Sequence, residues 1–499
     1  MSVGDQSMHG EPTHTDVVII GAGISGIGAG CYLRTRSPDR TFTILEGRAD
    51  LGGTWDLFRY PGVRSDSDMH TLGYSFKPWK GEKTITDGPS IQDYVRETAR
   101  EHGIDRHIRF NHHVTTAEWA SDSATWTITA TRTDSGETLI YTCGFLFMCS
   151  GYYSYRAGYE PDFPGRDRFT GPVIHPQKWP DGLDYAGKQV VVIGSGATAV
   201  TLVPALATDA EHVTMLQRSP TYMVSRPSVD PWAKRFRRFL PSKAAYALTR
   251  WMNINRTDKV YRATRSHPER VRQVLLGLVR QELGPNYDID THFTPSYDPW
   301  DQRLCLVPDG DFFKAVRNGA ASVVTDQIET FTETGIRLKS GEEIDADVII
   351  TATGLQLVTL GEMDFVVDGQ QVDFADTWTY KGMAYSDVPN MVSSFGYINA
   401  SWTLRVDLTC DYVCRLLNHM SEVGASICVP RLRPEDAGMP ARPWIENFSS
   451  GYMQRMMPLL PKQGDRQPWL NMQSYTAEKK QFRRDPIDDG VMRFERPRA

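Results

Sequence analysis

The sequence contains no uninterrupted run of about 18 apolar residues, the length that a membrane-spanning helix requires. The opening residues MSVGDQSMHGEPTHT also lack the apolar stretch of a secretory signal. Positive charge is not in excess, because the net charge is −6, so we expect no attraction to nucleic acid. These absences predict a protein of the cytoplasm, with residues 1–14 as a disordered tail.

Cysteine is sparse, and its spacing forms no motif. No two cysteines are arranged as CxxC, and their number is odd: Cys31, Cys143, Cys149, Cys305, Cys410, Cys414 and Cys428. This pattern gives no zinc site and no dithiol redox centre. We expect buried thiols, a reducing compartment and no metal.

The first informative motif follows a short apolar segment. Residues 16–20 (DVVII) predict a buried strand, and residues 21–26 (GAGISG) fit the GxGxxG pattern directly before a helical stretch. The next predicted strand, residues 41–45, ends at Glu46, which lies 20 residues past Gly26, where a ribose-binding acid belongs. Strand, turn, helix and acid together predict a dinucleotide site.

The same pattern occurs a second time. Residues 189–193 (QVVVI) predict a strand, and residues 194–199 (GSGATA) form the accepted GxGxxA variant. The following strand, residues 212–216, ends near Arg218 and has no acid at its tip. An arginine there can bind a 2′-phosphate, so this site is predicted to take NADP and not NAD.

Two such units in 499 residues predict more than one domain and two cofactors, FAD first and NADPH second, with hydride transfer between them. The fold class is therefore α/β, with two Rossmann-like dinucleotide-binding domains and a helical insert. We assign residues 15–155 and 350–499 to a discontinuous FAD-binding domain, residues 160–225 and 300–349 to the NADP-binding domain, and residues 226–299 to the insert.

The insert shows a helical apolar pattern and a basic segment. One helix face is predicted from Val271, Val274, Leu275, Leu278 and Val279. Residues 232–256 contain no acid and seven basic residues: Lys234, Arg235, Arg237, Arg238, Lys243, Arg250 and Arg256. Two interpretations are open. We favour a solvated helix face that covers the active site; the alternative is peripheral contact with anionic lipid.

Between the two units lies FTGPVIHPQKWP, residues 169–180, whose three prolines exclude an α-helix. This linker holds Phe169, Gly171, His175 and Trp179 in the pattern FxGxxxHxxxW. A histidine titrates near neutrality, so proton transfer is one possible role. A hinge or coupling role is favoured, because residues that position loops are often far from the chemistry.

The order of the motifs resembles that of the class B flavoprotein monooxygenases, and specifically the Baeyer–Villiger monooxygenases. FxGxxxHxxxW followed by Pro180 is the fingerprint of that family. A second signature of the family is filled by Gly53, Trp55, Tyr60, Pro61, Gly62 and Asp66. The resemblance covers nearly the whole chain, and several stretches look especially close to a bacterial, thioamide-activating member.

The resemblance implies a set of cofactor contacts. FAD would be bound by Gly21, Gly23, Ser25, Gly26, Glu46, Gly53, Thr54, Trp55, Asp56, Leu57 and the backbone of Val114. The nicotinamide would meet the flavin at Arg64, Ser65 and Asp66. NADP would be held by Gly194, Ser195, Gly196, Ala197, Thr198, Ala199, Val200, Arg218 and Ser219.

The resemblance also implies the reaction. NADPH would reduce FAD, and O2 would form a C4a-peroxyflavin that converts ketones to esters or lactones and oxygenates sulfides and thioamides. Arg303 matches the active-site arginine of the family, and Asp66 matches the carboxylate that positions it. At Gln302 many members have a lysine that binds the 2′-phosphate, so NADPH selection is expected to depend more on Arg218.

Three other classes of protein share parts of this pattern. A flavin disulfide reductase needs a cysteine pair, which the sequence lacks. An N-hydroxylating flavin monooxygenase is disfavoured by the linker motif. A non-oxygenating NADPH- and FAD-binding sensor would neither turn over NADPH nor need O2. The natural substrate and the oligomeric state are not specified by the sequence.

Overall fold

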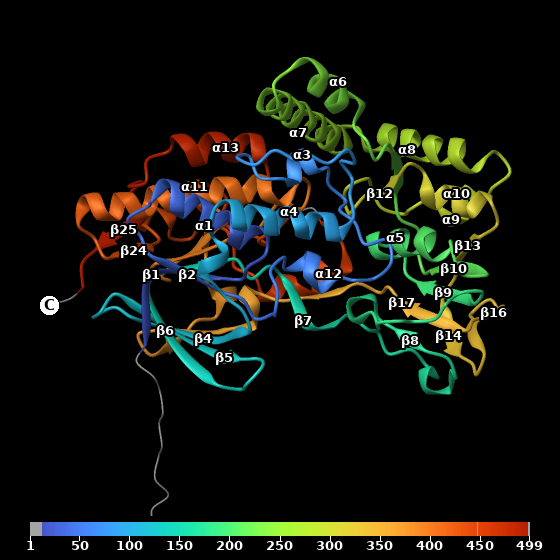
Figure 1. Ribbon diagram of the computed structural model, residues 1–499, viewed down its shortest axis with the longest axis horizontal. Helices are drawn as coiled ribbons and strands as arrows, with labels where there is room; N and C mark the ends of the chain where they lie inside the picture. The colour runs from blue at the N-terminus through green and yellow to red at the C-terminus, as the bar shows by residue number, and fades with distance from the viewer. Residues whose placement is uncertain (1–11, 447, 498–499) are drawn as a thin grey trace, which may run out of the picture.

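The computed structural model describes residues 12–446 and 448–497. Two sheets lie next to each other, with most of the helices along one side of them (Figure 1). Most of the predicted tail lies outside the described residues, but Thr13 and His14 already belong to the first strand and pair with Tyr141 and Thr142. Among the described residues, no helix is both long and apolar enough to span a membrane.

The larger sheet contains the first glycine-rich motif. Its strands are, in spatial order, β20 (Gln370–Gln371), β19 (Asp364–Val367), β4 (His112–Ala120), β5 (Thr125–Arg132), β6 (Thr138–Met148), β1 (Thr13–Ile20), β2 (Phe42–Leu45) and β3 (Ile108–Arg109), with β23 (Met391–Ser393) also on β6. β1, β2 and β6 are parallel and end in register at Ile20, Leu45 and Met148. The segments after these three strands therefore meet at one edge of the sheet.

Helix α1 (Ile24–Arg36) is buried along most of its length between this sheet and α11 (Trp402–Val423), and α4 (Gly88–Glu101) flanks it. Close packing requires small residues in α1. A Cβ on Gly28 would come within 3.0 Å of the Tyr74 ring, and one on Gly30 within 3.0 Å of the Ile104 side chain. Glycines hold α1 close to its neighbours here.

The second sheet is parallel and contains the second glycine-rich motif. Its order is β13 (Ala321–Thr325), β10 (His212–Gln217), β9 (Gln189–Ile193), β17 (Val348–Thr351) and β8 (Val173–Ile174), with α5 (Ala197–Leu206) and α10 (Asp311–Arg317) packed nearby. The predicted α/β class with two dinucleotide-type sheets is confirmed. β13 is the edge strand of this sheet and, among the described residues, pairs with β10 alone.

A small antiparallel meander follows β13 and is formed by β14 (Ile328–Phe331), β15 (Gly335–Leu338) and β16 (Glu343–Asp345). Two antiparallel segments connect the sheets: β7 (Tyr153–Gly158) pairs with β18 (Leu355–Leu357). The predicted linker is thus partly regular, because it also contributes β8 and a short 3-10 turn, η3 (Pro176–Lys178).

The insert is helical, as predicted. It consists of α6 (Pro231–Phe239), α7 (Ser242–Ser266), α8 (Pro268–Leu283) and α9 (Ile289–His292), between the paired strands β11 (Met223–Arg226) and β12 (Cys305–Pro308). The predicted apolar face of α8 is only half right. Leu275 and Val279 are buried, but Val274 and Leu278 are exposed, because α8 packs through a narrow stripe against β11 and α10.

Two strand boundaries are set by local turns. β3 and β4 are separated after Arg109 by a turn at Asn111, whose φ is 61°, and β6 ends at Met148. The remaining elements are α2 (Thr54–Leu57), α3 (Met69–Leu72), α12 (Gly451–Met456), α13 (Tyr475–Arg484), β21 (Thr379–Tyr380), β22 (Ala384–Tyr385), β24 (Ile427–Pro430), β25 (Met492–Glu495), η1 (Asp105–His107), η2 (Arg166–Arg168), η4 (Leu360–Glu362), η5 (Phe374–Asp376), η6 (Pro434–Asp436) and η7 (Met457–Leu459).

Candidate active site

A cleft of about 850 Å³ runs between the two sheets. It lies where parallel strands of both sheets end, which is the usual ligand position in such folds. The predicted site residues that line it are Gly21, Gly23, Ser25, Glu46, Gly53, Thr54, Trp55, Arg64, Ser65, Asp66, Gly194, Ser195, Gly196, Ala197, Thr198, Arg218, Ser219 and Arg303. The fold thus brings together residues from both motifs and the arginine.

The first glycine-rich turn packs tightly against the sheet on one side and lines the cleft on the other. A Cβ on Gly21, whose φ is +100°, would lie 2.6 Å from the Cys149 carbonyl oxygen, and one on Gly26 would collide with the Gly21 carbonyl. Gly23 caps α1 without any side-chain hydrogen bond, and the first turn of α1 has no acid. The exposed N–H groups and the positive helix end suit a pyrophosphate.

Glu46 stands beside this turn at the end of β2. Its side chain is buried, with Oε2 accepting a hydrogen bond from the Ala22 N–H at 2.7 Å and Oε1 accepting one from the Arg48 N–H at 2.9 Å. Burial raises the pKa of the carboxyl group above its usual value. Glu46 also lines the cleft, as a ribose-binding acid must.

The second glycine-rich turn repeats the arrangement in the smaller sheet. Gly196 caps α5 without a side-chain hydrogen bond, and nothing lies within 4 Å of the Cβ position it leaves open. Arg218, just beyond β10, is exposed and makes no ion pair or hydrogen bond with any residue that the structure describes. A helix N-terminus and an unpaired guanidinium fit a pyrophosphate and a 2′-phosphate.

Arg303 lines the cleft and lies in the loop that follows the insert. Its Nε lies 3.2 Å from Oδ2 of Asp66, and its Nη1 donates a hydrogen bond of 2.6 Å to the Ile398 carbonyl. Burial would lower the pKa of Arg303, but Asp66 and nearby tyrosines outweigh that effect and raise it. The guanidinium therefore stays charged, and 33% of the side chain remains exposed.

Helix α7 of the insert holds the loop that contains Arg303. Arg265 of α7 pairs with Asp301 at 3.0 Å and donates to the Pro299 carbonyl at 2.7 Å. No residue of the described insert, 226–299, lines the cleft. The expectation that the insert covers the active site is therefore not supported; α7 braces the loop instead.

Aromatic residues form a wall that sequence reasoning missed. The rings of Tyr152 and Trp402 stack at 5.0 Å with 13° between their planes, and Trp402 donates a hydrogen bond of 2.9 Å to Oγ of Ser25. The hydroxyl groups of Tyr152 and Tyr153 are 2.8 Å apart. The motif SGYYS directly after β6 was the one local signal for this wall.

An ion pair between a loop of the larger-sheet unit and a helix of the smaller-sheet unit was also missed. Arg64, in the loop after α2, pairs with Asp311 at the start of α10. In the same loop, a Cβ on Gly62, whose φ is +75°, would lie 2.8 Å from the Ala205 Cβ of α5. The loop that contains Gly62 and Arg64 therefore packs directly on helices α5 and α10 of the smaller sheet. These contacts fix the relative position of the two glycine-rich turns.

Several predicted cofactor residues do not line the cleft: Gly26, Asp56, Leu57, Val114, Ala199 and Val200. Asp56 is turned away because α2 directs it at Arg48 (2.6 Å), Arg59 (2.9 Å) and Gln92 (3.2 Å). The other side chains are packing groups behind the site. These residues can therefore contribute to cofactor binding only through their backbone atoms or by positioning the neighbouring residues that line the cleft.

His175 also lies outside the cleft lining. Its Nδ1 accepts a hydrogen bond from the Gln177 N–H at 3.2 Å, so Nε2 carries the proton and donates to the Gly354 carbonyl at 3.1 Å. Burial lowers the pKa of the imidazole, and this shift has the same direction as the hydrogen-bond pattern, in which Nδ1 carries no proton. A Cβ on Gly158 would collide with the ring. His175 thus joins the linker to both connecting segments, a geometry that favours coupling over proton transfer to substrate.

The sequence matches the family described as "Flavin-binding monooxygenase-like" over residues 14–269. The chain belongs to this family. It is 53% identical over 483 residues to the FAD-containing monooxygenase EthA of Mycobacterium tuberculosis, covering 96% of this chain and 98% of that protein. It is 51% identical over 487 residues to EthA of Mycolicibacterium smegmatis, covering 97% and 98%. The resemblance that the motifs predicted is confirmed.

Solved structures agree with this placement. An oxidized steroid monooxygenase bound to NADP matches with a TM-score of 0.71 and 26% identity, covering 85% of this chain and 88% of its own. An open structure of cyclohexanone monooxygenase matches with a TM-score of 0.75 and 21% identity, covering 97% and 100%. The second likeness concerns the fold alone.

Proposed function

We propose that this flavin-dependent monooxygenase contains FAD, uses NADPH and O2, and carries out Baeyer–Villiger oxidation of ketones to esters or lactones. Oxygenation of sulfur in sulfides and thioamides is part of the same proposal. The observation that carries it is the position of Arg303, charged and paired with Asp66 in the cleft between the two glycine-rich turns.

The cleft fits both cofactors. The uncapped N-terminus of α1, with Glu46 beside it, suits FAD, and the uncapped N-terminus of α5, with Arg218 beside it, suits NADPH. When bound, FAD takes electrons from NADPH and delivers activated oxygen to the substrate. Tyr152 and Trp402 offer a flat apolar wall that keeps water from this part of the cleft.

Arg303 supplies the electrostatic part of the reaction. A guanidinium has five N–H donors, and the contacts with Asp66 and Ile398 leave others for the cleft. Oxygen insertion next to a carbonyl passes through negative charge on oxygen. A positive group fixed beforehand stabilises that charge without reorganising during the reaction. Asp66 orients the guanidinium, and the hydrogen bond to Ile398 limits its rotation.

A panel assay tests this function. The purified yellow protein is given NADPH and a set of ketones and sulfides, and NADPH use, O2 use and product mass are followed. The proposal predicts substrate-dependent gain of one oxygen, and no product when O2 is removed. A protein that oxidises NADPH only slowly and yields only hydrogen peroxide with every ketone and sulfide would contradict it.

A further inference from the structure

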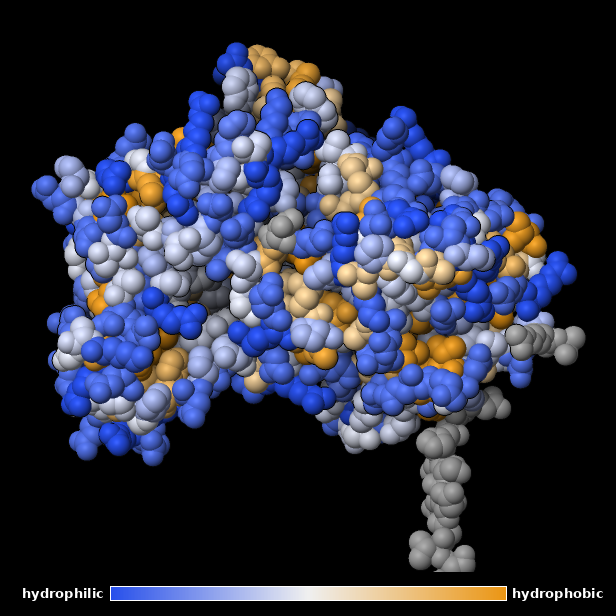
Figure 2. Space-filling model, turned by 180° about the vertical axis from the view of Figure 1, so that it is seen from behind, coloured by the Kyte–Doolittle hydropathy of each residue, from blue (hydrophilic) through white to orange (hydrophobic). Residues whose placement is uncertain are grey.

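The hairpin of α6 and α7, residues 231–266, exposes large apolar side chains. These are Trp232 (49% exposed), Phe239 (71%), Leu240 (38%), Leu248 (37%), Trp251 (63%) and Val260 (44%). The hairpin projects from the molecule, and hydrophobic residues gather at its tip among strongly hydrophilic ones (Figure 2). Single exposed apolar residues are ordinary, but a group of this size on one element marks an interaction surface.

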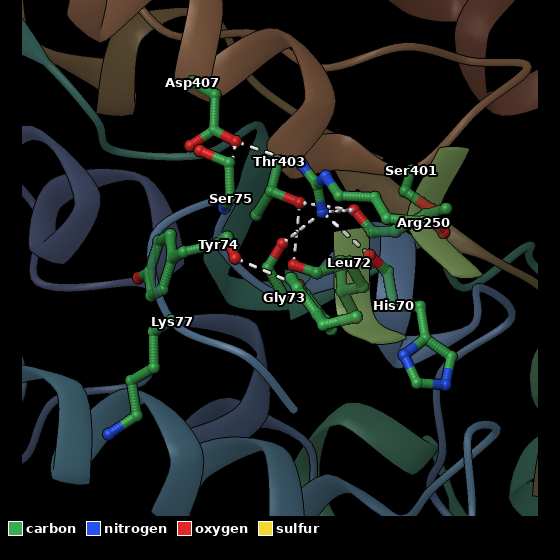
Figure 3. A network of polar contacts seen from close by, with 12 residues as sticks. His70, Leu72, Gly73, Tyr74, Ser75, Lys77, Arg250, Ser401, Thr403 and Asp407 are labelled. Atoms are coloured by element: carbon green, nitrogen blue, oxygen red, sulfur yellow. Dashed lines mark hydrogen bonds and ion pairs between the residues drawn. The ribbon is translucent and has the colours of Figure 1, made fainter. Parts of the chain in front are cut away.

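Helix α7 turns its polar side inward. Its buried residues include Tyr246, Arg250 and Asn253, and Arg250 donates hydrogen bonds to the carbonyls of His70 (2.9 Å) and Gly73 (2.7 Å). The guanidinium also pairs with Asp407 of α11 at 3.0 Å (Figure 3). These contacts fix the rotation of α7, so that the apolar residues Leu248 and Trp251 must face outward. Surface helices normally show the reverse arrangement.

The seven basic residues of 232–256 do not all face solvent in the same way. Arg250 is buried, and Arg237 donates to the carbonyls of Trp79 and Gly81. Arg237 is thus exposed but bound to backbone carbonyls. The other exposed basic residues of the segment are Arg235, Arg238, Lys243 and Arg256, together with Lys234, which lies 3.6 Å from Glu82. Residues 232–256 contain no acid. The hairpin therefore combines exposed aromatic and aliphatic residues with positive charge.

We propose that the tip of this hairpin docks on an anionic lipid bilayer. Tryptophan and phenylalanine enter the interfacial layer of a membrane, and lysine and arginine contact acidic headgroups. Phe239, Leu240 and Trp251 are the inserting residues, and Arg235, Arg238 and Lys243 are the headgroup contacts. An anionic surface attracts this local positive charge although the chain as a whole carries a net charge of −6.

A second copy of the chain fits this surface less well. A two-fold contact would place the same patch against itself, and residues 232–256 offer no acid to neutralise the opposed arginines. Since no residue of 226–299 lines the cleft, docking leaves the cofactor site accessible. The inference stands independently of which substrate is oxidised.

Flotation with vesicles tests the docking. Full-length FAD-loaded protein is mixed with vesicles of phosphatidylcholine alone or mixed with phosphatidylglycerol, at low and high salt. We expect binding to the acidic vesicles that weakens with salt. Replacing Arg235 and Arg238 together with glutamine should lower the partition coefficient roughly fivefold for each residue. The triple variant Phe239→Ser/Leu240→Ser/Trp251→Ser should abolish flotation.

Matched controls are Val274→Ser and Val423→Ser, which remove exposed apolar side chains elsewhere, at 55% and 45% exposure. Both should float like the wild type, and all variants should keep the basal rate of NADPH oxidation. Absence of wild-type flotation, or flotation that the hairpin variants leave unchanged, would overturn the proposal. So would a wild type that self-associates without vesicles, by light scattering, when the triple variant does not.

Discussion

Replacing Arg303 with alanine should lower the rate of oxygenation roughly 10²–10³-fold but leave FAD bound and reducible by NADPH. The variant removes the charged group in the cleft and its contacts with Asp66 and the Ile398 carbonyl. Neither glycine-rich turn contacts this side chain through a hydrogen bond in the described structure, so cofactor binding should be preserved. The defect should therefore appear after flavin reduction.

The size of the effect of Arg303→Ala on folding and on the rate follows from the surroundings of Arg303 and Asp66. The side chains of Arg303 and Asp66 are 33% and 35% exposed, and ion pairs open to solvent contribute only about 0–1 kcal/mol to folding. The variant should thus fold. Removal of one preorganised group that stabilises developing negative charge costs about 2.7–4 kcal/mol, or roughly 10²–10³ in rate. The loss should be catalytic and not structural.

Arg303→Lys and Asp66→Asn refine the test. Lysine keeps the charge but has no planar fork to reach Asp66 and Ile398 together, so we expect an intermediate loss, on the order of tenfold. Asp66→Asn keeps a hydrogen-bond acceptor without the charge. Stopped-flow absorbance follows flavin reduction, and mass spectrometry follows product. An alanine variant with near-normal product yield would refute the role of Arg303.

Three other variants test other parts of the account. His175→Ala should keep its FAD but lose product formation. Because burial lowers the pKa of His175, the wild type should lose stability as the pH falls below about 6.5. Thermal melts of the variant should show a smaller loss of stability over the same pH range. Arg218→Ala should raise the KM for NADPH roughly 10–100-fold, since hydrogen bonds to charged groups contribute about 1.5–3 kcal/mol, and should leave the KM for NADH unchanged. Arg250→Met should destabilise the fold by about 3–5 kcal/mol by stranding buried Asp407, and Arg250→Met/Asp407→Asn should recover much of that loss in denaturant unfolding. Equal NADPH and NADH effects, or a double variant no more stable than the single one, would count against these assignments.

Local motifs predicted the parts of the site that local backbone geometry determines. Each glycine-rich turn follows a buried strand within a few residues, so GAGISG and GSGATA could be placed at strand ends before any contact was known. Gly21 and Gly26 are needed because a Cβ there would strike the backbone of the same turn or of the adjacent strand end. Because these steric requirements are local, they produce a glycine pattern that can be recognised in the sequence.

Contacts between segments far apart in the sequence could not be predicted, because they produce no local motif. Trp402 and Ser25 are 377 positions apart, and Arg64 and Asp311 are 247 apart. The pairing of Arg303 with Asp66 was inferred only from the family resemblance. The inner face of α7 could not be predicted from apolar periodicity, because it combines the buried Ala245 and Tyr246 with Arg250 and Asn253, which are held by hydrogen bonds. Amphipathic patterns identify the inner face of a helix only when burial is hydrophobic.

Isotopically labelled O2 gives the most direct test of the central claim. The purified protein is incubated with NADPH, a cyclic ketone and labelled O2 in ordinary water, and the lactone is examined by mass spectrometry. The account predicts one labelled oxygen in each lactone molecule and stoichiometric NADPH consumption. A lactone that carries oxygen from water, or labelled hydrogen peroxide as the main product, would contradict it.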